Sequence, residues 1–451
     1  MKFGIKNLGP INDANIEIGD LTIICGKNNV GKTYFTYSLF SFLDTITSNV
    51  TVNISQSMLE SFYSKGVLNI DLESLLPDYK EALEDATKRF SKVLYLFLAK
   101  KESDTCNSLF SCSITDDEYN KNIQNLSLKD IHFPIVEKCD IIANKKENSS
   151  LLSLLLSNIA ESLPEKDVIC NSVTLCVSVL FNTIFSDAFI ITCERTGASL
   201  FRNELIISRE MSKDQQTKQY IERVDNLRKK QEFLGYPLPI KKDIEFSIHC
   251  CNESLEESFL CKEEIGKSIF SCFKRMIGGN IGVKAGSIVV FTPDSSNTSL
   301  HLIESSSVIR SLSELFFYLK YKAKKEQILM IDEPELSLHP QNQRMIARLF
   351  AMLIHAGIKV FITTHSDYII REFNTLIMLN RDTERIKRLR ETFNYEPVEL
   401  LSPDQIRCYV AEGNTVKPMN VSPKFGIEVT SFDDTISQVN RIQQTLLYGD
   451  E

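Results

Sequence analysis

The sequence has no uninterrupted apolar run long enough to span a bilayer. Its most apolar stretch, residues 168–185, is broken by Asn171, Ser172, Thr174, Ser178, Asn182 and Thr183. Because a spanning helix needs about 20 mostly apolar residues, we expect this stretch to form a buried helix. The chain also begins without a signal-peptide pattern. The sequence therefore predicts a cytoplasmic protein with no membrane partner.

The sequence also lacks any CxxC pair. Its 12 cysteines are not interleaved with histidines at zinc-binding spacing, so a structural zinc site is not expected. In a chain of 451 residues with no secretion signal, the cysteines are predicted to be reduced thiols in the core rather than a disulfide framework.

Positive charge is not in excess. The 51 Lys and Arg residues against 59 Asp and Glu residues give 51 − 59 = −8, so no overall basic field draws the protein to nucleic acid or to an anionic membrane. A local basic groove is still compatible with this charge, so nucleic acid stays open as a partner without being indicated. A hydrophobic content of 43% excludes disorder as the main state.

The order of apolar patterns predicts an α/β protein whose core is interrupted twice. Residues 1–47 hold three strands and a phosphate loop, and residues 48–185 are interpreted as a helical insertion. Residues 186–207 return to the core with one strand. Residues 208–279 are predicted to form a second helical insertion or a short charged arm. Residues 280–451 complete the core with alternating helices and strands.

A glycine-rich motif directly follows the predicted strand at residues 21–25. It reads Gly26-Lys27-Asn28-Asn29-Val30-Gly31-Lys32-Thr33 and fits GxxxxGK[ST] between a strand and a helix. In such a loop, backbone N–H groups surround the phosphates at a helix N-terminus, Lys32 reaches the β- and γ-phosphates, and the Thr33 hydroxyl ligates Mg²⁺. The motif predicts a site for ATP and Mg²⁺ in which Lys32 takes part in catalysis.

A second motif completes this site from the other end of the chain. The apolar strand at residues 328–331 leads into Asp332 and Glu333, which places both carboxylates at the carboxyl edge of the sheet, where phosphates bind. Asp332 is predicted to hold Mg²⁺, and Glu333 to orient and polarise the attacking water. Alone, such a pair is an ordinary solvated strand end. Beside a phosphate loop, it indicates catalysis.

The segment Asp332-Glu333-Pro334-Glu335-Leu336-Ser337-Leu338-His339-Pro340 resembles the Walker B motif and D-loop of ABC-class ATPases of the SMC and OLD type. His365 ends a predicted strand 32 residues after Glu333, at the place of that family's switch histidine, which contacts the γ-phosphate. The resemblance implies an ABC-type ATPase head, a mixed P-loop sheet with large helical insertions. It also implies that two heads enclose two ATP molecules, as a homodimer or a higher oligomer.

The same resemblance implies a signature sequence about 25 residues before Walker B, which reaches the γ-phosphate of the opposite subunit. Ser305-Ser306-Ser307-Val308 lies there and opens an apolar helix. Ser306 and Ser307 are therefore predicted to bind the nucleotide held by a second copy. The segment departs from the usual LSGGQ, and a purely structural helix N-cap is the alternative.

A glutamine loop is replaced by Cys193-Glu194-Arg195-Thr196-Gly197, which resembles the ERTG segment of related stand-alone ATPases. The resemblance implies that Glu194 and Arg195 contact the nucleotide. The alternative is a surface salt bridge at the end of a strand.

The regulated process is predicted from what the chain lacks. Residues 208–233 suit a helix of about 35 to 40 Å, too short for the coiled-coil arm of a chromosome-structuring SMC protein. Beyond Asp367, 451 − 367 = 84 residues remain, too few for the Toprim nuclease domain of OLD-type proteins. The resemblance thus implies a sensor or regulatory subunit of a bacterial anti-phage defence system that controls a separate nuclease or toxin effector. The alternative is a DNA-binding repair or recombination ATPase of the SMC-like class.

Overall fold

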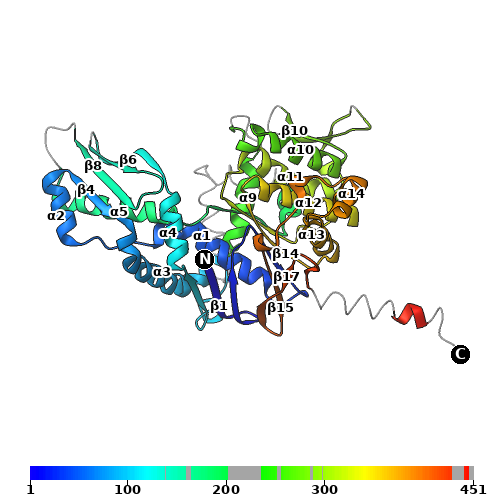
Figure 1. The fold of residues 1–451 in the computed structure, drawn as a ribbon, viewed down its shortest axis with the longest axis horizontal. Helices are drawn as coiled ribbons and strands as arrows, with labels where there is room; N and C mark the ends of the chain where they lie inside the picture. The colour runs from blue at the N-terminus through cyan, green and yellow to red at the C-terminus, as the bar shows by residue number, and fades with distance from the viewer. Residues whose placement is uncertain are drawn as a thin grey trace, which may run out of the picture.

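The structure, a computed structural model, describes residues 1–137, 139–158, 164–201, 235–250, 255–284, 288–296, 298–428 and 441–445. The helices are α1 (Lys32–Asn49), α2 (Gln56–Lys65), α3 (Leu76–Phe97), α4 (Asp116–Asn125), α5 (Lys166–Asn182), α6 (Arg195–Leu200), α9 (Leu238–His249), α10 (Glu264–Ile277), α11 (Ser307–Tyr321), α12 (Pro340–His355), α13 (Asp367–Leu379) and α14 (Glu384–Phe393). Figure 1 shows how they are arranged.

The strands fall into one large sheet and three small ones. The large sheet contains β1 (Lys2–Leu8), β2 (Ile11–Glu17), β3 (Leu21–Cys25), β5 (Leu109–Ser113), β9 (Ala188–Ile191), β13 (Ile328–Asp332), β14 (Lys359–Thr364), β15 (Ile406–Glu412) and β16 (Thr415–Pro418). The small sheets contain β4 (Val67–Asp71), β6 (Leu128–Val136), β7 (Cys139–Lys145) and β8 (Leu151–Asn158); β10 (Gly279–Lys284), β11 (Ile288–Pro293) and β12 (Leu300–His301); and β17 (Val421–Ser422) and β18 (Gly426–Ile427).

The large sheet is mixed and confirms the predicted α/β fold class. Its order is β5-β1-β2-β16-β15-β3-β14-β13-β9. Strands β15, β3, β14, β13 and β9 pair in parallel, whereas β5, β1 and β2 pair antiparallel at one side. This is the predicted P-loop sheet, with β3 as its central phosphate-loop strand.

Both faces of the parallel strands are buried, as their nearly continuous apolar sequences predict. In β13, Ile328 and Met330 join a core shared with α1, α3 and α5, whereas Leu329 and Ile331 join a second core shared with α10 to α13. The sheet is thus the middle layer of three. Because β3, β14 and β13 are parallel, their carboxyl ends meet at one edge of the sheet.

The prediction of a purely helical insertion over residues 48–185 is wrong. Strand β5 pairs with β1 in the large sheet, and β4, β8, β7 and β6 form a separate antiparallel sheet. The inward residues of β7 alternate strictly with the outward ones, a period-2 pattern over only seven residues. An apolar pattern this short is compatible with either a helix or a strand, so the charged helices on both sides of it favoured a helical interpretation. In Figure 1, this lobe lies on the opposite side of the molecule from α10 to α14.

The second predicted insertion is helical where it is described, in α9 and α10. The charged segment 208–233, predicted as a helix or short arm, lies outside the described residues. Among the helices that the structure describes, none combines the length and apolar character needed to cross a membrane.

Candidate functional site

The loop between β3 and α1 has the backbone shape of a phosphate cradle. Gly26 has φ +145° and Gly31 has φ +99°, conformations that side chains rarely adopt. A Cβ atom on Gly26 would lie 2.5 Å from the carbonyl oxygen of Ala411. Both glycines are therefore required for the loop to turn from the strand into the first turn of α1, where N–H groups are available to an anion.

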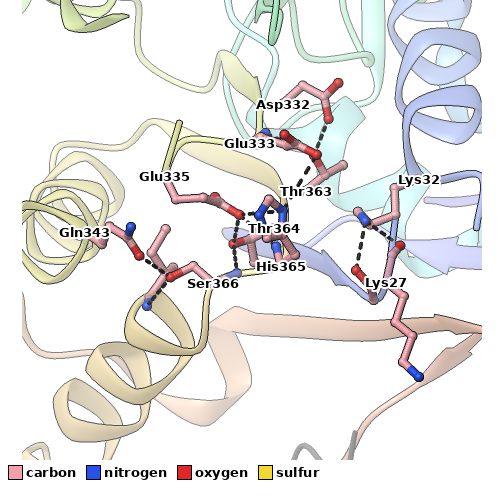
Figure 2. Close-up of polar contacts among 12 residues, drawn as sticks. Lys27, Lys32, Asp332, Glu333, Glu335, Gln343, Thr363, Thr364, His365 and Ser366 are labelled. Carbon is pink, nitrogen blue, oxygen red and sulfur yellow. Dashed lines mark hydrogen bonds and ion pairs between the residues drawn. The ribbon is translucent and has the colours of Figure 1, made fainter. Parts of the chain in front are cut away.

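Lys32 lies inside this loop. Its Nζ donates to the carbonyl oxygens of Gly26 and Lys27, at 2.8 Å each, and only 6% of the residue is exposed. Burial lowers the pKa of Lys32, and the carboxylates of Glu333 and Asp332 oppose that effect. The ammonium group is thus held at the loop in an environment of negative charge (Figure 2).

A pocket of about 600 Å³ opens in front of the loop. It is lined by Pro10, Asn28, Asn29, Gly31, Lys32, Thr33, Tyr34 and Glu333. Of the predicted loop residues, Gly26 and Lys27 instead offer their carbonyl oxygens to Lys32, and Val30 packs against the core. The loop and the Walker B carboxylate of Glu333 therefore share one pocket, although 299 residues of chain separate Thr33 from Asp332.

Thr33 and Asp332 form the pair of oxygens that was predicted to hold Mg²⁺. The Thr33 hydroxyl donates to Asp332 Oδ2 at 3.3 Å, and the Thr363 hydroxyl donates to Asp332 Oδ1. Burial raises the pKa of Asp332, and the hydrogen bond from Thr363 opposes this. Mg²⁺ is commonly bound by one or two protein oxygens together with phosphates and water, so this donor set fits the ion.

Glu333 leaves the strand in a left-handed conformation, with φ +51°, which is uncommon for a residue other than glycine. Its N–H donates to the carbonyl and to the hydroxyl oxygen of Thr363, both at 3.2 Å. The carboxylate thereby lines the pocket in front of Lys32. Strained backbone of this kind gathers at functional sites.

His365 lies beside Glu333, and a second carboxylate holds it; its predicted contact with the γ-phosphate stays a prediction. His365 Nδ1 lies 3.7 Å from Glu333 Oε1 and 3.2 Å from Glu335 Oε1. Glu335 Oε1 also accepts from the His365 N–H at 2.8 Å and from the Thr364 hydroxyl at 2.9 Å. Figure 2 shows these contacts.

Glu335 is the residue that sequence reasoning missed. The sequence resemblance gives Glu335 no role of its own, although the second carboxylate of Asp-Glu-Pro-Glu is the signal that points to it. Its side chain is 6% exposed, and Oε2 has no hydrogen-bond partner among the described residues. A buried carboxylate of this kind is suited to fix the orientation of the imidazole.

The predicted signature serines do not lie in the pocket lined by their own chain. Ser306 is the N-cap residue of α11, but its side chain makes no capping hydrogen bond. Both Ser306 and Ser307 are exposed. The missing cap bond disfavours the structural alternative, and the contact of these serines with a second copy stays a prediction.

The prediction for Arg195 needs correction, whereas that for Glu194 stays a prediction. Glu194 is exposed, and its Oε2 accepts from the Tyr37 hydroxyl at 3.1 Å. Arg195 is 2% exposed, and its guanidinium donates to main-chain carbonyls that include those of Asp332 and Glu333. Arg195 is therefore neither a nucleotide ligand nor half of a surface salt bridge, because burial turns it toward the Walker B backbone.

A phosphate loop, a buried Mg²⁺-type oxygen pair and a positioned glutamate define a P-loop ATPase site. The family model of the AAA ATPase domain matches residues 1–370, and the chain belongs to this family. No curated protein sequence matches the chain.

Three solved structures are similar over most of both chains. One is the Smc head domain of Pyrococcus furiosus bound to the C-terminal domain of ScpA, with 12% identity, a TM-score of 0.34 and 98% of each chain covered. A SmcHead bound to the C-winged helix domain of ScpA has 11% identity and a TM-score of 0.35, covering 93% of this chain and 97% of the other. The SMC head domain from Thermotoga maritima has 9% identity and a TM-score of 0.30, covering 93% and 98%. Similarity at this level adds nothing to the family assignment.

We expect Glu335→Gln to lower the rate of ATP hydrolysis about tenfold. The amide oxygen can still accept from the His365 N–H, but the charge facing Nδ1 is lost, and a hydrogen bond to a charged group contributes ~1.5 kcal/mol or more. Steady-state kinetics and a melting curve measure the effect, with the exposed Glu326→Gln as control. Unchanged turnover in Glu335→Gln would show that Glu335 does not orient His365.

Proposed function

We propose that this protein binds ATP with Mg²⁺, hydrolyses it, and uses the nucleotide to control its own dimerisation. The observation that carries the proposal is that the Glu333 carboxylate lines the pocket of the phosphate loop while His365 lies against it. A bound γ-phosphate at Lys32 is then within the same pocket as the group that can polarise water.

Each residue of the site has a role that follows from its chemistry. The loop N–H groups and Lys32 bind the β- and γ-phosphates, and Thr33 with Asp332 would hold Mg²⁺, which supplies positive charge against the phosphates when bound. Glu333 orients and polarises the attacking water as a general base. His365, held by Glu335, adds a polar contact on the side of the γ-phosphate.

In this proposal, a second copy supplies the groups that contact the γ-phosphate from the open side of the pocket. The exposed hydroxyls of Ser306 and Ser307 stand at the N-terminus of α11, where helix N–H groups and the helix dipole attract an anion. If two copies face each other, these groups reach the γ-phosphate of the opposite copy. ATP would then join the two copies, and hydrolysis would release them.

We expect Glu333→Gln to bind ATP as tightly as the wild type and to slow hydrolysis by ~10²-fold or more, because the general base is lost. With ATP and Mg²⁺, it should accumulate as a dimer in light scattering after gel filtration. Lys32→Ala should neither bind nor dimerise. Ser307→Arg should bind ATP but stay monomeric. A Glu333→Gln protein that turns over ATP at the wild-type rate would sink the proposal.

We further propose that the dimer acts on a separate effector protein, which docks on the lobe built by residues 50–185. Its four-stranded sheet buries one face against α2 and α5. On the other face, Val67 of β4, Leu155 of β8 and Ile142 of β7 form an apolar row across three strands. Val67 is 41% and Leu155 39% exposed, and adjacent exposed apolar side chains of this kind support an interaction surface here.

The predicted role in anti-phage defence follows from the sequence resemblance and stays a prediction. The contacts described at the site do not specifically favour the DNA-repair alternative. The isolation experiment below distinguishes it from an effector protein.

We expect Glu333→Gln, isolated from its native host with ATP and Mg²⁺, to retain one dedicated protein in stoichiometric amount. Adding Val67→Asp and Leu155→Asp should lower that recovery at least ~10-fold, because charges on the apolar row oppose its burial. Leu175→Asp on α5, where Leu175 is 64% exposed, is the matched control. Recovery of nuclease-sensitive DNA without a protein would instead support the repair clamp.

A further inference from the structure

Arg195 is a buried cation. Its guanidinium N–H groups donate hydrogen bonds to main-chain carbonyls at the Walker B motif. Nη1 donates to the carbonyl oxygens of Thr192 at 3.0 Å and Asp332 at 2.9 Å, and Nη2 donates to that of Glu333 at 2.7 Å. Nε donates to the Ser311 hydroxyl at 3.0 Å. Asp332 is the last residue of β13 and Glu333 is the first residue after it, so their carbonyls lie where the regular sheet bonding stops, and the planar guanidinium serves both at once.

Ser311 connects this cluster to the signature helix. It lies in α11, one turn after Ser307, and its hydroxyl donates to the carbonyl oxygen of Leu336 at 3.0 Å while accepting from Arg195. The segment from Asp332 to Leu336 is therefore held at both ends by one contiguous group. That segment contains Glu333 and Glu335, the two carboxylates at His365.

Two carboxyl groups balance the buried charge of Arg195. Asp243 of α9 and Glu314 of α11 are both 1% exposed. Asp243 Oδ2 accepts from the Thr192 N–H at 2.9 Å and from its hydroxyl at 2.5 Å. Burial raises the pKa of both acids, and for Glu314 the neighbouring Asp243 raises it further.

The geometry agrees with one proton shared by this pair. Asp243 Oδ1 and both Glu314 oxygens are buried and make no hydrogen bond of good geometry with the residues that the structure describes. A proton on Glu314 gives the pair a net charge of −1 against +1 on Arg195. The cluster would then be neutral, which avoids the cost of an uncompensated buried charge.

We propose that Arg195 is a positioning residue that couples the signature helix α11 to the catalytic glutamate: through Ser311 and the carbonyls of Asp332 and Glu333, movement of α11 sets the orientation of Glu333. This inference rests on the proposed ATPase function. Engagement of Ser306 and Ser307 by the nucleotide of a second copy is then transmitted along α11 to the residue that directs water.

The experiment is a double-mutant cycle on the full-length protein. Single-turnover hydrolysis and the Kd for ATP are measured for wild type, Ser311→Ala, Arg195→Lys, Glu333→Gln, and Ser311→Ala combined with Glu333→Gln. Ser313→Ala is the matched control, because Ser313 is similarly buried on α11 and its hydroxyl contacts the Arg310 carbonyl and the Ser199 hydroxyl rather than the Walker B segment. Melting curves accompany each variant.

We expect Ser311→Ala to slow hydrolysis about tenfold with less than about twofold change in Kd, and Ser313→Ala to leave both unchanged. Arg195→Lys should slow hydrolysis at least as much, since an ammonium cannot serve both carbonyls and Ser311 together. In the Glu333→Gln background, Ser311→Ala should have less than about a twofold further effect, because the group that it positions is gone. A purely structural role would lower the melting temperature without this non-additivity.

Two results would overturn the inference. One is wild-type hydrolysis by Ser311→Ala, and the other is an equal effect of Ser311→Ala with and without Glu333. If Arg195→Lys does not fold, Ser311→Ala alone decides. If the wild type itself hydrolyses no ATP, the proposed function fails, which is distinct from failure of the coupling.

Discussion

The parallel pairing of β3, β14 and β13 is the constraint on which the nucleotide site depends. Its register places Thr364 beside Cys25 and Thr363 beside Asp332. The Thr363 hydroxyl reaches Asp332, and both Thr363 oxygens accept from the Glu333 N–H. A slip of one residue would turn these side chains to opposite faces of the sheet. The two apolar cores on either side of the strands oppose such a slip, because the apolar residues of these strands are buried in one core or the other.

Much of the site could be predicted from sequence because its chemistry is local. The phosphate loop needs glycine at fixed positions, and Gly26 and Gly31 indeed have positive φ. An apolar strand that ends in two acids can be recognised within six residues. The alternation of helices and strands after residue 280 follows from the same kind of short-range pattern, and β13 lies within one residue of the strand expected at residues 328–331.

What the sequence could not show depends on contacts between distant segments. Strand β5 lies within residues 48–185, which were predicted to be helical, yet it pairs with β1, about 100 residues earlier. Glu194 and Arg195 are adjacent and both charged, yet one is exposed and the other buried. Their difference is set by Asp243, Glu314 and the carbonyls of Walker B, which come from three other parts of the chain. In sequence, a surface ion pair cannot be distinguished from a buried arginine that donates to main-chain carbonyls.

The buried charge near Walker B has an energetic cost that a stable fold alone does not explain. Taking an arginine and two acids out of water costs several kcal/mol per ion, and apolar replacements of similar volume are often no less stable. The cluster is better explained by the main chain that its hydrogen bonds fix. Glu333 departs from strand geometry, so its carbonyl has no partner within the sheet that the structure describes and is held by the Arg195 guanidinium instead. An apolar side chain could fill the space but could not do this.

The position of the Arg195 cluster along α11 suggests a route by which nucleotide binding at Ser306 and Ser307 would affect hydrolysis at Glu333. Ser307 and Ser311 are one helical turn apart, about 6 Å along the axis. Ile309, Leu312 and Leu315 bury the helix in the core shared with β13 and α12. A helix packed in this way moves as a body, since a close-packed interior transmits displacement rather than absorbing it. In the proposed dimer, a displacement of the exposed serines would therefore reach Arg195, which donates to Ser311 of α11 and to the carbonyls of Asp332 and Glu333.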